Sequence, residues 1–256
     1  MQVLYPRFLC HFYEIPIASY DHDGLPDSTF DLDDENVDIH WGTLDVDLKR
    51  REGKGRFKTA HPGWVKLDAT PDLPPFTNQK VCVKQIYRQW TNGAIARVSG
   101  REELGAFVEE FNCVRWASIL LDMTYQFVAC EIVKRGEPPY PIPELRYTRA
   151  MVAIVQGDSE KAFIVEELIY SDKGEDKPQF RKYIDNRNPK SLLHITEPAN
   201  AHAIAYFLLF SQHFQWQKTH MGAFVSDYQG AGRLLTDPQI TSNPYILHMH
   251  ALQPSC

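Results

Sequence analysis

Alternation of apolar and polar residues marks several short segments in the first two-thirds of the chain. Residues 37–41 and 43–48 alternate in this way, which is typical of strands with one buried face. Residues 81–87 form a strongly apolar run that predicts another strand. Residues 151–156 and 162–169 flank a Gly-Asp turn, as the two strands of a hairpin do. These patterns predict a mostly antiparallel sheet.

Apolar residues recur at helical spacing in the segments between and after these strands. Ser99 and Glu102 form a capping box, and the following residues place one apolar face on a helix. That face consists of Leu104, Phe107, Val108 and Phe111. A second apolar stretch, 116–133, is helical or mixed, and the proline-rich segment 138–143 then ends regular structure. Residues 196–198 can begin another helix, whose expected buried face holds Ile204, Phe207 and Leu208. The predicted fold class is therefore α+β.

Length, charge and cysteine usage restrict the classes of protein to consider. The 256 residues suffice for one large domain or for two small lobes around a cleft. The net charge of −6 argues against a general nucleic-acid binder. The five cysteines form no Cys-x-x-Cys pair and are odd in number. This usage predicts reduced thiols in an intracellular, cytoplasmic protein.

The N-terminal region predicts neither a signal peptide nor a membrane anchor. Arg7, His11 and Glu14 interrupt any signal-peptide core. The longest apolar run, near 203–210, is much shorter than the roughly 20 residues that span a bilayer, so we expect no membrane partner. Residues 21–39 are rich in Asp and lack Lys and Arg, which is typical of a solvated, mobile loop.

The stretch 224–240 holds the most informative chemistry of the chain. A short apolar run predicts a strand, and along it Asp227 and Gln229 project from one face. Two glycines follow, where the backbone can turn sharply or approach a ligand closely. Asp237 precedes a proline, which favours an extended conformation. Two carboxylates and an amide oxygen suit Mg²⁺, while the alternative is a hairpin with solvated polar tips.

Two upstream segments carry lysines that can meet phosphate groups. In 53–63, glycines followed by basic residues can fold over phosphates or form an ordinary basic hairpin turn. In the strand 81–87, Lys84 shares a face with apolar neighbours. Such a lysine either extends its amine to water or meets an anion. The residues themselves leave both alternatives open in each segment.

The string Asp227-Tyr-Gln-Gly-Ala-Gly232, followed by Thr236-Asp-Pro-Gln-Ile240, resembles the catalytic segment of the alpha-type (atypical) protein kinases. The resemblance extends from about residue 37 to residue 240 in the family's order. It implies a two-lobed, protein-kinase-like α+β fold with an ATP cleft between the lobes. It also divides the chain into an N-terminal extension with an acidic loop, 1–36, and an alpha-kinase-like domain, 37–256, whose C-terminal part is incomplete.

The resemblance also implies roles for individual residues. Asp227 orients the acceptor hydroxyl or takes its proton, and Gln229 and Asp237 ligate Mg²⁺. ATP is held by Gly55, Lys58, Lys84, Glu166 and Leu168. Lys58 stands where relatives often have Arg, and the backbone of Glu166 and Leu168 contacts adenine in the linker between the lobes. From pattern alone, 163–169 is equally an ordinary strand end.

Two further elements match the family without a settled role. Glu109-Glu110-Phe-Asn resembles an element of the predicted helix, and either glutamate is a candidate partner for Lys84. Lys182-Tyr-Ile-Asp-Asn186 resembles the Lys-Tyr-x-x-Asn segment that follows the linker.

The resemblance ends after Ile240. Family members continue with a glycine-rich loop and a His-x-Cys-x-x-x-Cys cluster that completes a structural zinc site with a helix histidine. His213 occupies that histidine's place, where it can equally cap helix carbonyls. His248, His250 and Cys256 are the other available zinc ligands, but their spacing does not match the cluster. The sequence therefore predicts an incomplete zinc site and a domain cut short.

The function expected from this reading is a protein serine/threonine kinase that transfers the γ-phosphate of ATP to a protein hydroxyl. The alternative is a nucleotide-binding pseudokinase or interaction module that keeps the ATP site and lacks full activity. The expected partners are ATP, with Mg²⁺, and a protein substrate that the sequence does not identify.

The zinc expectation is tested by metal analysis of the purified protein. Structural zinc contributes folding free energy because its ligands are gathered only in the folded state. We expect less than one zinc per chain, and His213→Ala should change neither the zinc content nor the melting temperature. One zinc per chain that is lost in His213→Ala would contradict the prediction.

Overall fold

The computed structural model describes residues 5–14, 30–33, 37–55, 57–68, 78–89, 95–98, 100–158, 161–169 and 179–243. Most of the acidic segment 21–39, and His248, His250 and Cys256, lie outside these residues. Two compact units are present, and each is described by itself. Unit 1 comprises 1–16, 30–111 and 148–168, and unit 2 comprises 17–29, 112–147 and 169–256.

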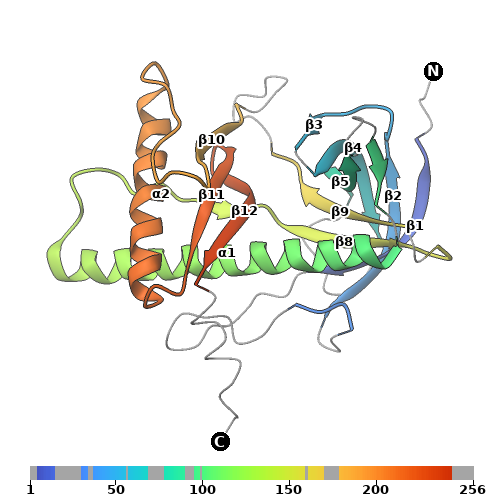
Figure 1. The fold of residues 1–256 in the computed structure, drawn as a ribbon, viewed down its shortest axis with the longest axis horizontal. Helices are drawn as coiled ribbons and strands as arrows, with labels where there is room; N and C mark the ends of the chain where they lie inside the picture. The colour runs from blue at the N-terminus through green and yellow to red at the C-terminus, as the bar shows by residue number, and fades with distance from the viewer. Residues whose placement is uncertain are drawn as a thin grey trace, which may run out of the picture. The chain divides into compact units, whose positions relative to one another are not determined.

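Figure 1 shows the strands and the two described helices, coloured in their order along the chain. In unit 1 the strands are β1 (Arg7–Glu14), β2 (Ile39–Val46), β3 (Gly53–Lys54), β4 (Lys58–Leu67), β5 (Gln79–Gln89), β6 (Ile95–Arg97), β8 (Ala150–Val155) and β9 (Ala162–Glu167). Helix α1 (Gly100–Arg135) belongs to both units. Unit 2 adds β7 (Arg146–Tyr147), β10 (Arg181–Ile184), α2 (Ala199–Lys218), β11 (Ala223–Ala231) and β12 (Leu234–Ser242).

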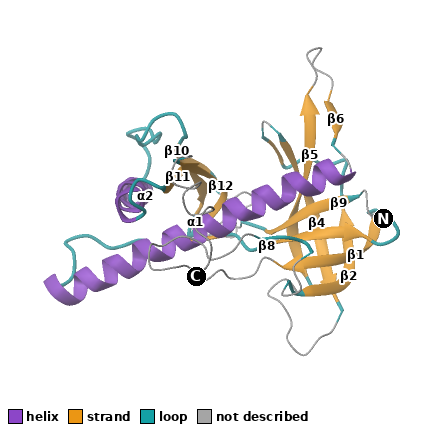
Figure 2. Ribbon diagram, turned by 60° about the horizontal axis from the view of Figure 1, so that its bottom comes forward, coloured by secondary structure: helices purple, strands orange, loops and turns teal. Residues whose placement is uncertain are grey.

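The strands of unit 1 form a closed antiparallel sheet. Its strand order is β3-β4-β2-β1-β8-β9-β5-β6, and an additional pairing of β4 with β5 closes six of the strands into a ring. Figure 2 shows these strands together. Leu44, Val65, Val83 and Phe163 lie in the core that the ring encloses. The predicted antiparallel sheet is thus confirmed, and closure leaves it without long free edges.

The two predicted strands at 37–41 and 43–48 are one strand, β2. Gly42 joins them, because a Cβ atom there would lie 2.3 Å from the backbone oxygen of Lys66 on β4. The glycine lets the two backbones approach where any side chain would separate them. The apparent break in the sequence pattern is therefore a point of close strand contact.

Strands β8 and β9 are buried on both faces, which explains their nearly continuous apolar sequence. Met151 and Phe163 point into the ring. Val152 and Ile164 face the other way and pack with Phe107 of α1. The predicted hairpin around the Gly-Asp turn is confirmed by the pairing of the two strands.

Helix α1 is one continuous helix of 36 residues where the sequence suggested two segments. Its residues up to 111 contribute to the core of unit 1, and Leu120 and Leu121 contribute to that of unit 2. Glu102, the expected capping-box residue, makes an ion pair with Arg88. By length and composition α1 could also cross a bilayer. Core helices of soluble proteins pass the same test, so this one helix is weak evidence for a membrane span.

Unit 2 contains a four-stranded sheet packed on α2. The order is β10-β11-β12-β7, with β7 parallel to β12 and the other pairings antiparallel. Figure 1 shows β11 and β12 beside α2. Tyr228 and Leu235 of the sheet share a core with Ala205 and Leu208 of α2. The predicted helix after 198 is confirmed, and its apolar face is buried as expected.

The β11–β12 hairpin depends on two glycines. Gly232 lies in the turn with φ of 58°, a conformation that most other residues avoid. Gly230 lies against Leu234, whose backbone oxygen would be only 1.9 Å from an added Cβ atom. The glycines therefore serve a sharp turn and a close approach of two strands, as one of the sequence alternatives proposed.

Gly230→Ala should destabilise the protein by at least about 2 kcal/mol, because the new methyl group forces the two backbones apart. Denaturant unfolding measures the change. Gly105→Ala is the matched control, since nothing lies within 4 Å of its added Cβ. In the interior of α1 this control should stabilise by about 0.5–1 kcal/mol. Equal effects of the two substitutions would contradict the close approach at Gly230.

Candidate functional site

The pairing of β11 with β12 leaves its regular register at Asp227. Val225 pairs with Ile240 and Gln229 with Thr236, and both pairs belong to one regular register. Asp227 pairs with Gln239, which is one residue out of that register. The strand β10 also changes register between Lys182 and Ile184. Bulges of this kind redirect side chains, and they are frequent beside active sites.

One core contains the residues on both sides of the bulge, and this shows how the bulge changes the direction of side chains. Val225 and Tyr228 both belong to the core shared with α2. In a regular strand, residues three apart point to opposite faces. The register shift lets both face the core, so that the two residues between them, Ser226 and Asp227, turn away from it together. The Ser226 hydroxyl donates to the Gln239 carbonyl at 3.2 Å, which secures the bulge to β12.

The expected extended conformation of Asp237 is wrong. Its φ is 49°, although Pro238 follows. Between Gln239 and Thr236 the strand β12 contains one residue more than β11 does, and Asp237 lies in this irregular part. Asp is among the few residues that adopt positive φ at moderate cost, so the bulge determines the backbone here.

The Asp227 carboxylate is buried and only partly satisfied. Its Oδ2 accepts a hydrogen bond from Lys182 Nζ at 2.7 Å, and its Oδ1 is buried without a hydrogen-bond partner. Burial raises the pKa of Asp227 above its ordinary value, Lys182 partly offsets this, and the charges of Asp185 and Asp237 raise it again. A buried oxygen without a partner costs stability, so this atom is available for a ligand.

The same surroundings fit a divalent cation. Asp237 lies close enough to Asp227 to raise its pKa, so two carboxylates share one region of the sheet. Gln229 is on the strand of Asp227 and pairs with Thr236, the residue before Asp237. Mg²⁺ prefers oxygen donors of these kinds. Within the described residues no group of three His, Cys, Asp or Glu side chains gathers for a metal, so a third ligand would be the Gln229 amide or water.

Unit 1 contains the residues expected to contact the nucleotide. The loop between β3 and β4 is closed by a hydrogen bond from Gly55 N–H to Lys58 C=O of 2.8 Å. The Tyr87 hydroxyl donates to the Gly55 carbonyl, and Tyr87 N–H donates to Phe57 C=O. The glycine loop is therefore attached to β5, the strand of Lys84.

The two expected phosphate-binding lysines lie on one face of the sheet. Lys58 pairs with Ile86 across β4 and β5, and Lys84 is two residues from Ile86. Lys84 and Glu166 are both buried and form an ion pair of 2.7 Å. Lys58 forms an ion pair with Glu110 of α1. Lys84 is thus bound to an anion and does not simply extend to water.

The remaining expected site residues are less informative. Leu168 follows the end of β9 and is half-buried. His213 is exposed on α2, and the other expected zinc ligands lie outside the described residues. The zinc expectation therefore stays a prediction.

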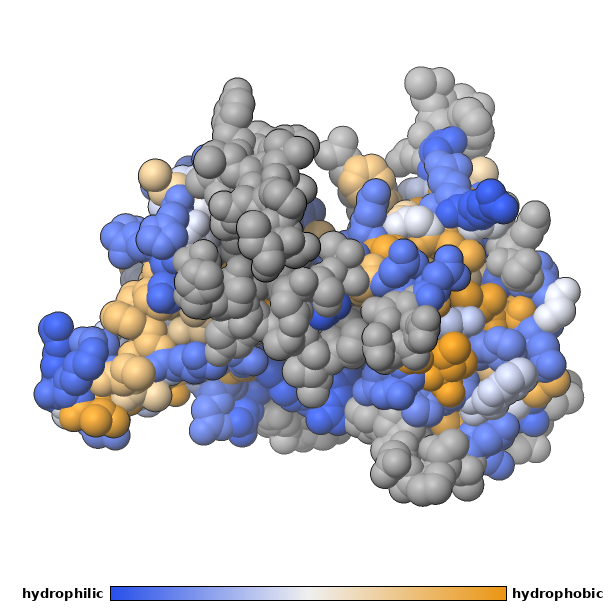
Figure 3. Space-filling model, turned by 90° about the horizontal axis from the view of Figure 1, so that it is seen from below, coloured by the Kyte–Doolittle hydropathy of each residue, from blue (hydrophilic) through white to orange (hydrophobic). Residues whose placement is uncertain are grey.

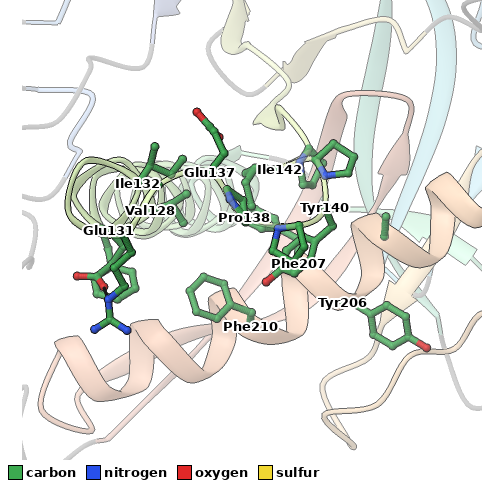
Figure 4. A pocket seen from close by; sticks show the side chains of 17 residues that line it. Val128, Glu131, Ile132, Glu137, Pro138, Tyr140, Ile142, Tyr206, Phe207 and Phe210 are labelled. Atoms are coloured by element: carbon green, nitrogen blue, oxygen red, sulfur yellow. Dashed lines mark ion pairs between the residues drawn. The ribbon is translucent and has the colours of Figure 1, made fainter.

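A hollow of about 880 Å³ in unit 2 contains none of the expected site residues. It lies between α2 and the end of α1 (Figure 4), and Phe127 and Phe207 are among the apolar side chains that line it. Figure 3 shows apolar residues beside hydrophilic ones on one face of the molecule. Arg135 is the single basic residue of the lining and is paired with Glu131, so the hollow does not suit a nucleotide phosphate.

Sequence reasoning missed the partners of these charged groups. Lys182 stood in a matched motif, but nothing in the sequence indicated that it would reach Asp227 across two strands. Glu166 was expected to contribute its backbone, while its side chain holds Lys84. Of the two glutamates proposed for Lys84, Glu110 binds Lys58 and Glu109 is exposed. Strand pairing, which the sequence does not specify, sets these contacts.

Comparisons with a family model and with solved structures both lead to alpha-kinases. The model of the alpha-kinase family matches residues 53–252. Among solved structures, the C-terminal truncated alpha-kinase domain of myosin heavy chain kinase is 13% identical, with a TM-score of 0.57, covering 93% of this chain and 85% of that one. The alpha-kinase domain of myosin heavy chain kinase A in complex with ADP is 15% identical, with a TM-score of 0.56 and coverage of 93% and 83%. The search of curated proteins gave no match.

Lys182→Met should raise the pKa of Asp227 further, because the lysine is the cation that opposes the effect of burial. A raised carboxyl pKa favours the folded state at low pH, and this contribution is lost as pH rises through the folded pKa. Stability should therefore fall more with rising pH in the variant. Titration of the Asp227 carboxyl carbon by NMR measures the shift. Lys190→Met, at an exposed lysine, is the control, and equal titration in both variants would contradict the contact.

Proposed function

Because this chain belongs to the alpha-kinase family, we propose that it transfers the γ-phosphoryl group of ATP to a serine or threonine hydroxyl of a protein. The observation that carries this proposal is the buried Asp227 carboxylate, with one oxygen held by Lys182 and the other without a partner. A carboxylate oxygen without a partner is suited to accept a hydrogen bond from a substrate hydroxyl group.

Nucleotide binding is assigned to residues of unit 1. Lys84 and Lys58 would contact the phosphate oxygens, and the glycine loop at Gly55 would lie over them. Each lysine is held by a carboxylate, Glu166 or Glu110, which fixes its position before a nucleotide arrives. Fixed charges favour phosphoryl transfer, because this reaction depends mainly on positioning and on stabilisation of charge. Glu166 and Leu168 would contact the adenine through their backbone.

Asp227 would act on the acceptor hydroxyl. Its Oδ1 can accept the hydroxyl hydrogen bond and orient the oxygen for attack on the phosphorus. As the new oxygen–phosphorus bond forms, the bond between the γ-phosphorus and the bridging oxygen breaks, ADP leaves, and the hydroxyl proton can pass to the same Asp227 atom. Burial raises the pKa of Asp227, which makes the carboxylate a better proton acceptor than an exposed one. Lys182 keeps enough positive charge nearby for the carboxylate to stay ionised before the proton arrives.

A magnesium ion would be held by Gln229 and Asp237, with Asp227 close by. When bound, Mg²⁺ neutralises charge that develops on the phosphate oxygens. The charges of Asp185 and Asp237 contribute to the raised pKa of Asp227, so a cation bound beside these carboxylates would oppose that effect. We expect the added cation to lower the pKa of Asp227.

The second candidate function is a nucleotide-binding pseudokinase or interaction module. The observation that favours it is the ion pairing of both lysines with carboxylates. In the pseudokinase the lysines would stay with Glu166 and Glu110 in place of the phosphates, whereas in the kinase each lysine would contact its glutamate and a phosphate together. We further propose an intracellular, cytoplasmic location, which agrees with the reduced thiols of Cys10 and Cys130.

Lys84→Ala should weaken ATP binding tenfold or more, since a hydrogen bond to a charged group contributes on the order of 1.5–3 kcal/mol. Calorimetric titration with Mg-ATP measures the affinity. Lys80→Ala is the matched control, because Lys80 is an exposed lysine of the same strand. Removing Lys84 leaves Glu166 buried without this partner, so the double variant Lys84→Ala, Glu166→Gln should recover stability without recovering affinity. Unchanged affinity in both variants would overturn the assignment.

Asp227→Asn should lower kcat by about 10²–10⁴-fold while leaving the affinity for ATP within about twofold, because the amide keeps the shape and loses the proton acceptor. Transfer of labelled γ-phosphate to a mixture of Ser- and Thr-containing peptides measures kcat. If the unmodified protein binds ATP and transfers nothing, the pseudokinase is correct. Transfer by the variant at the parent rate would exclude Asp227 as the acceptor-binding residue.

A further inference from the structure

Helix α2 is attached to β11 by polar side chains that lie inside the core of unit 2. Ser211, Gln212 and Gln215 of α2 are buried, and Gln215 is 0% exposed. Thr219 follows at the helix end, where its hydroxyl accepts from Ala223 N–H and can donate to either Gln215 C=O or Ala223 C=O, each at 2.9 Å. The start of β11 is therefore fixed to the last turn of α2.

Gln212 and Gln215 supply the hydrogen bonds to Val225 that a neighbouring strand would otherwise make. The described pairing of β10 with β11 covers Tyr228 to Gly230 and does not reach Val225. On that side of Val225, its N–H donates to Gln215 Oε1 at 3.0 Å, and its C=O accepts from Gln212 Nε2 at 2.8 Å. The two glutamine side chains thus satisfy the backbone groups of the residue immediately before the bulge.

Gln215 also reaches the residue immediately after the bulge. Its Nε2 donates to the Tyr228 hydroxyl at 3.2 Å and to Ser211 Oγ at 2.8 Å. Ser211 Oγ is 3.1 Å from Thr124 Oγ1 of α1, which extends the network through the core. One side-chain amide therefore uses its oxygen at Val225 and its nitrogen at Tyr228. These two residues flank Ser226 and Asp227 directly.

We propose that Gln215 is a positioning residue for Asp227: by binding both ends of the bulge, it holds the register shift that turns the carboxylate away from the core. Any side chain of similar size could fill the same space. The two-sided hydrogen bonding is what selects an amide, because an apolar side chain leaves the Val225 N–H unpaired in the core. The role assigned to the carboxylate rests on the proposed function, whereas the control of the bulge does not.

Gln215→Met tests the proposal, since methionine keeps the volume and removes both contacts. Gln217→Met is the matched control, because Gln217 is exposed on the same helix. Ser211→Ala is a second comparison, which weakens the core network and leaves the Val225 bond intact. The measurements are amide hydrogen exchange at Val225 and Asp227, the Asp227 carboxyl titration by NMR, ATP affinity, and kcat and KM for phosphate transfer.

In Gln215→Met we expect exchange at Val225 and Asp227 to speed up at least tenfold more than at β12 residues outside the bulge. We expect a changed Asp227 titration, a kcat at least tenfold lower, and an ATP affinity within about twofold of the parent. Ser211→Ala should lose thermal stability and keep kcat within about threefold.

Two results would overturn the proposal. One is uniform loss of exchange protection across unit 2 with an unchanged Asp227 titration, which is the result of a purely structural role. The other is equal behaviour of Gln215→Met and Ser211→Ala in kcat. If the unmodified protein transfers no phosphate, the proposed function fails, and exchange with the titration still decides whether Gln215 controls the bulge.

Discussion

The register shift around Asp227 is the constraint on which the candidate site depends. A strand that packs on a helix can bury alternate residues only, so an aspartate in phase with core residues would have to face the core. One extra residue in the pairing removes that conflict and lets the same strand hold a core tyrosine and a buried carboxylate that meets Lys182. The irregularities in β10 and β12 beside it follow from the same adjustment. Regular pairing is therefore interrupted at Asp227, and this interruption sets the direction of its carboxylate.

Pairing of buried charges is the second organising effect. Lys84 and Glu166 are both poorly hydrated, whereas Lys182 is 43% exposed and pairs with the buried carboxylate of Asp227. Such pairs contribute little net stability, because desolvation offsets much of their attraction. Their value lies in geometry, since each partner limits the positions the other can take. In the function proposed above, phosphoryl transfer depends on fixed charges, and these pairs would supply them in the free protein.

The elements of the fold could be predicted from the sequence where burial sets a clear period. The alternation in β2, the doubly buried hairpin β8–β9 and the apolar face of α2 were all recognisable. Details failed where close backbone contact overrides local preference. Gly42 looked like a break between strands, and Asp237 before a proline looked extended. The candidate site residues were proposed from motif strings. The contacts of Lys182, Gln215 and the Glu166 side chain join distant segments, and no local pattern encodes them.

The closed sheet of unit 1 also determines when this part of the chain can become native. Cys10 in β1 pairs with Val155 in β8, and Val83 in β5 pairs with Val165 in β9. One edge of β1 pairs with the nearby β2, but its other edge pairs with β8, and all of α1 is synthesised between β1 and β8. Pairings so distant along the chain close slowly. The nascent chain therefore carries unpaired strand edges until β9 has been synthesised. Chaperones that bind it during this time would protect it against aggregation.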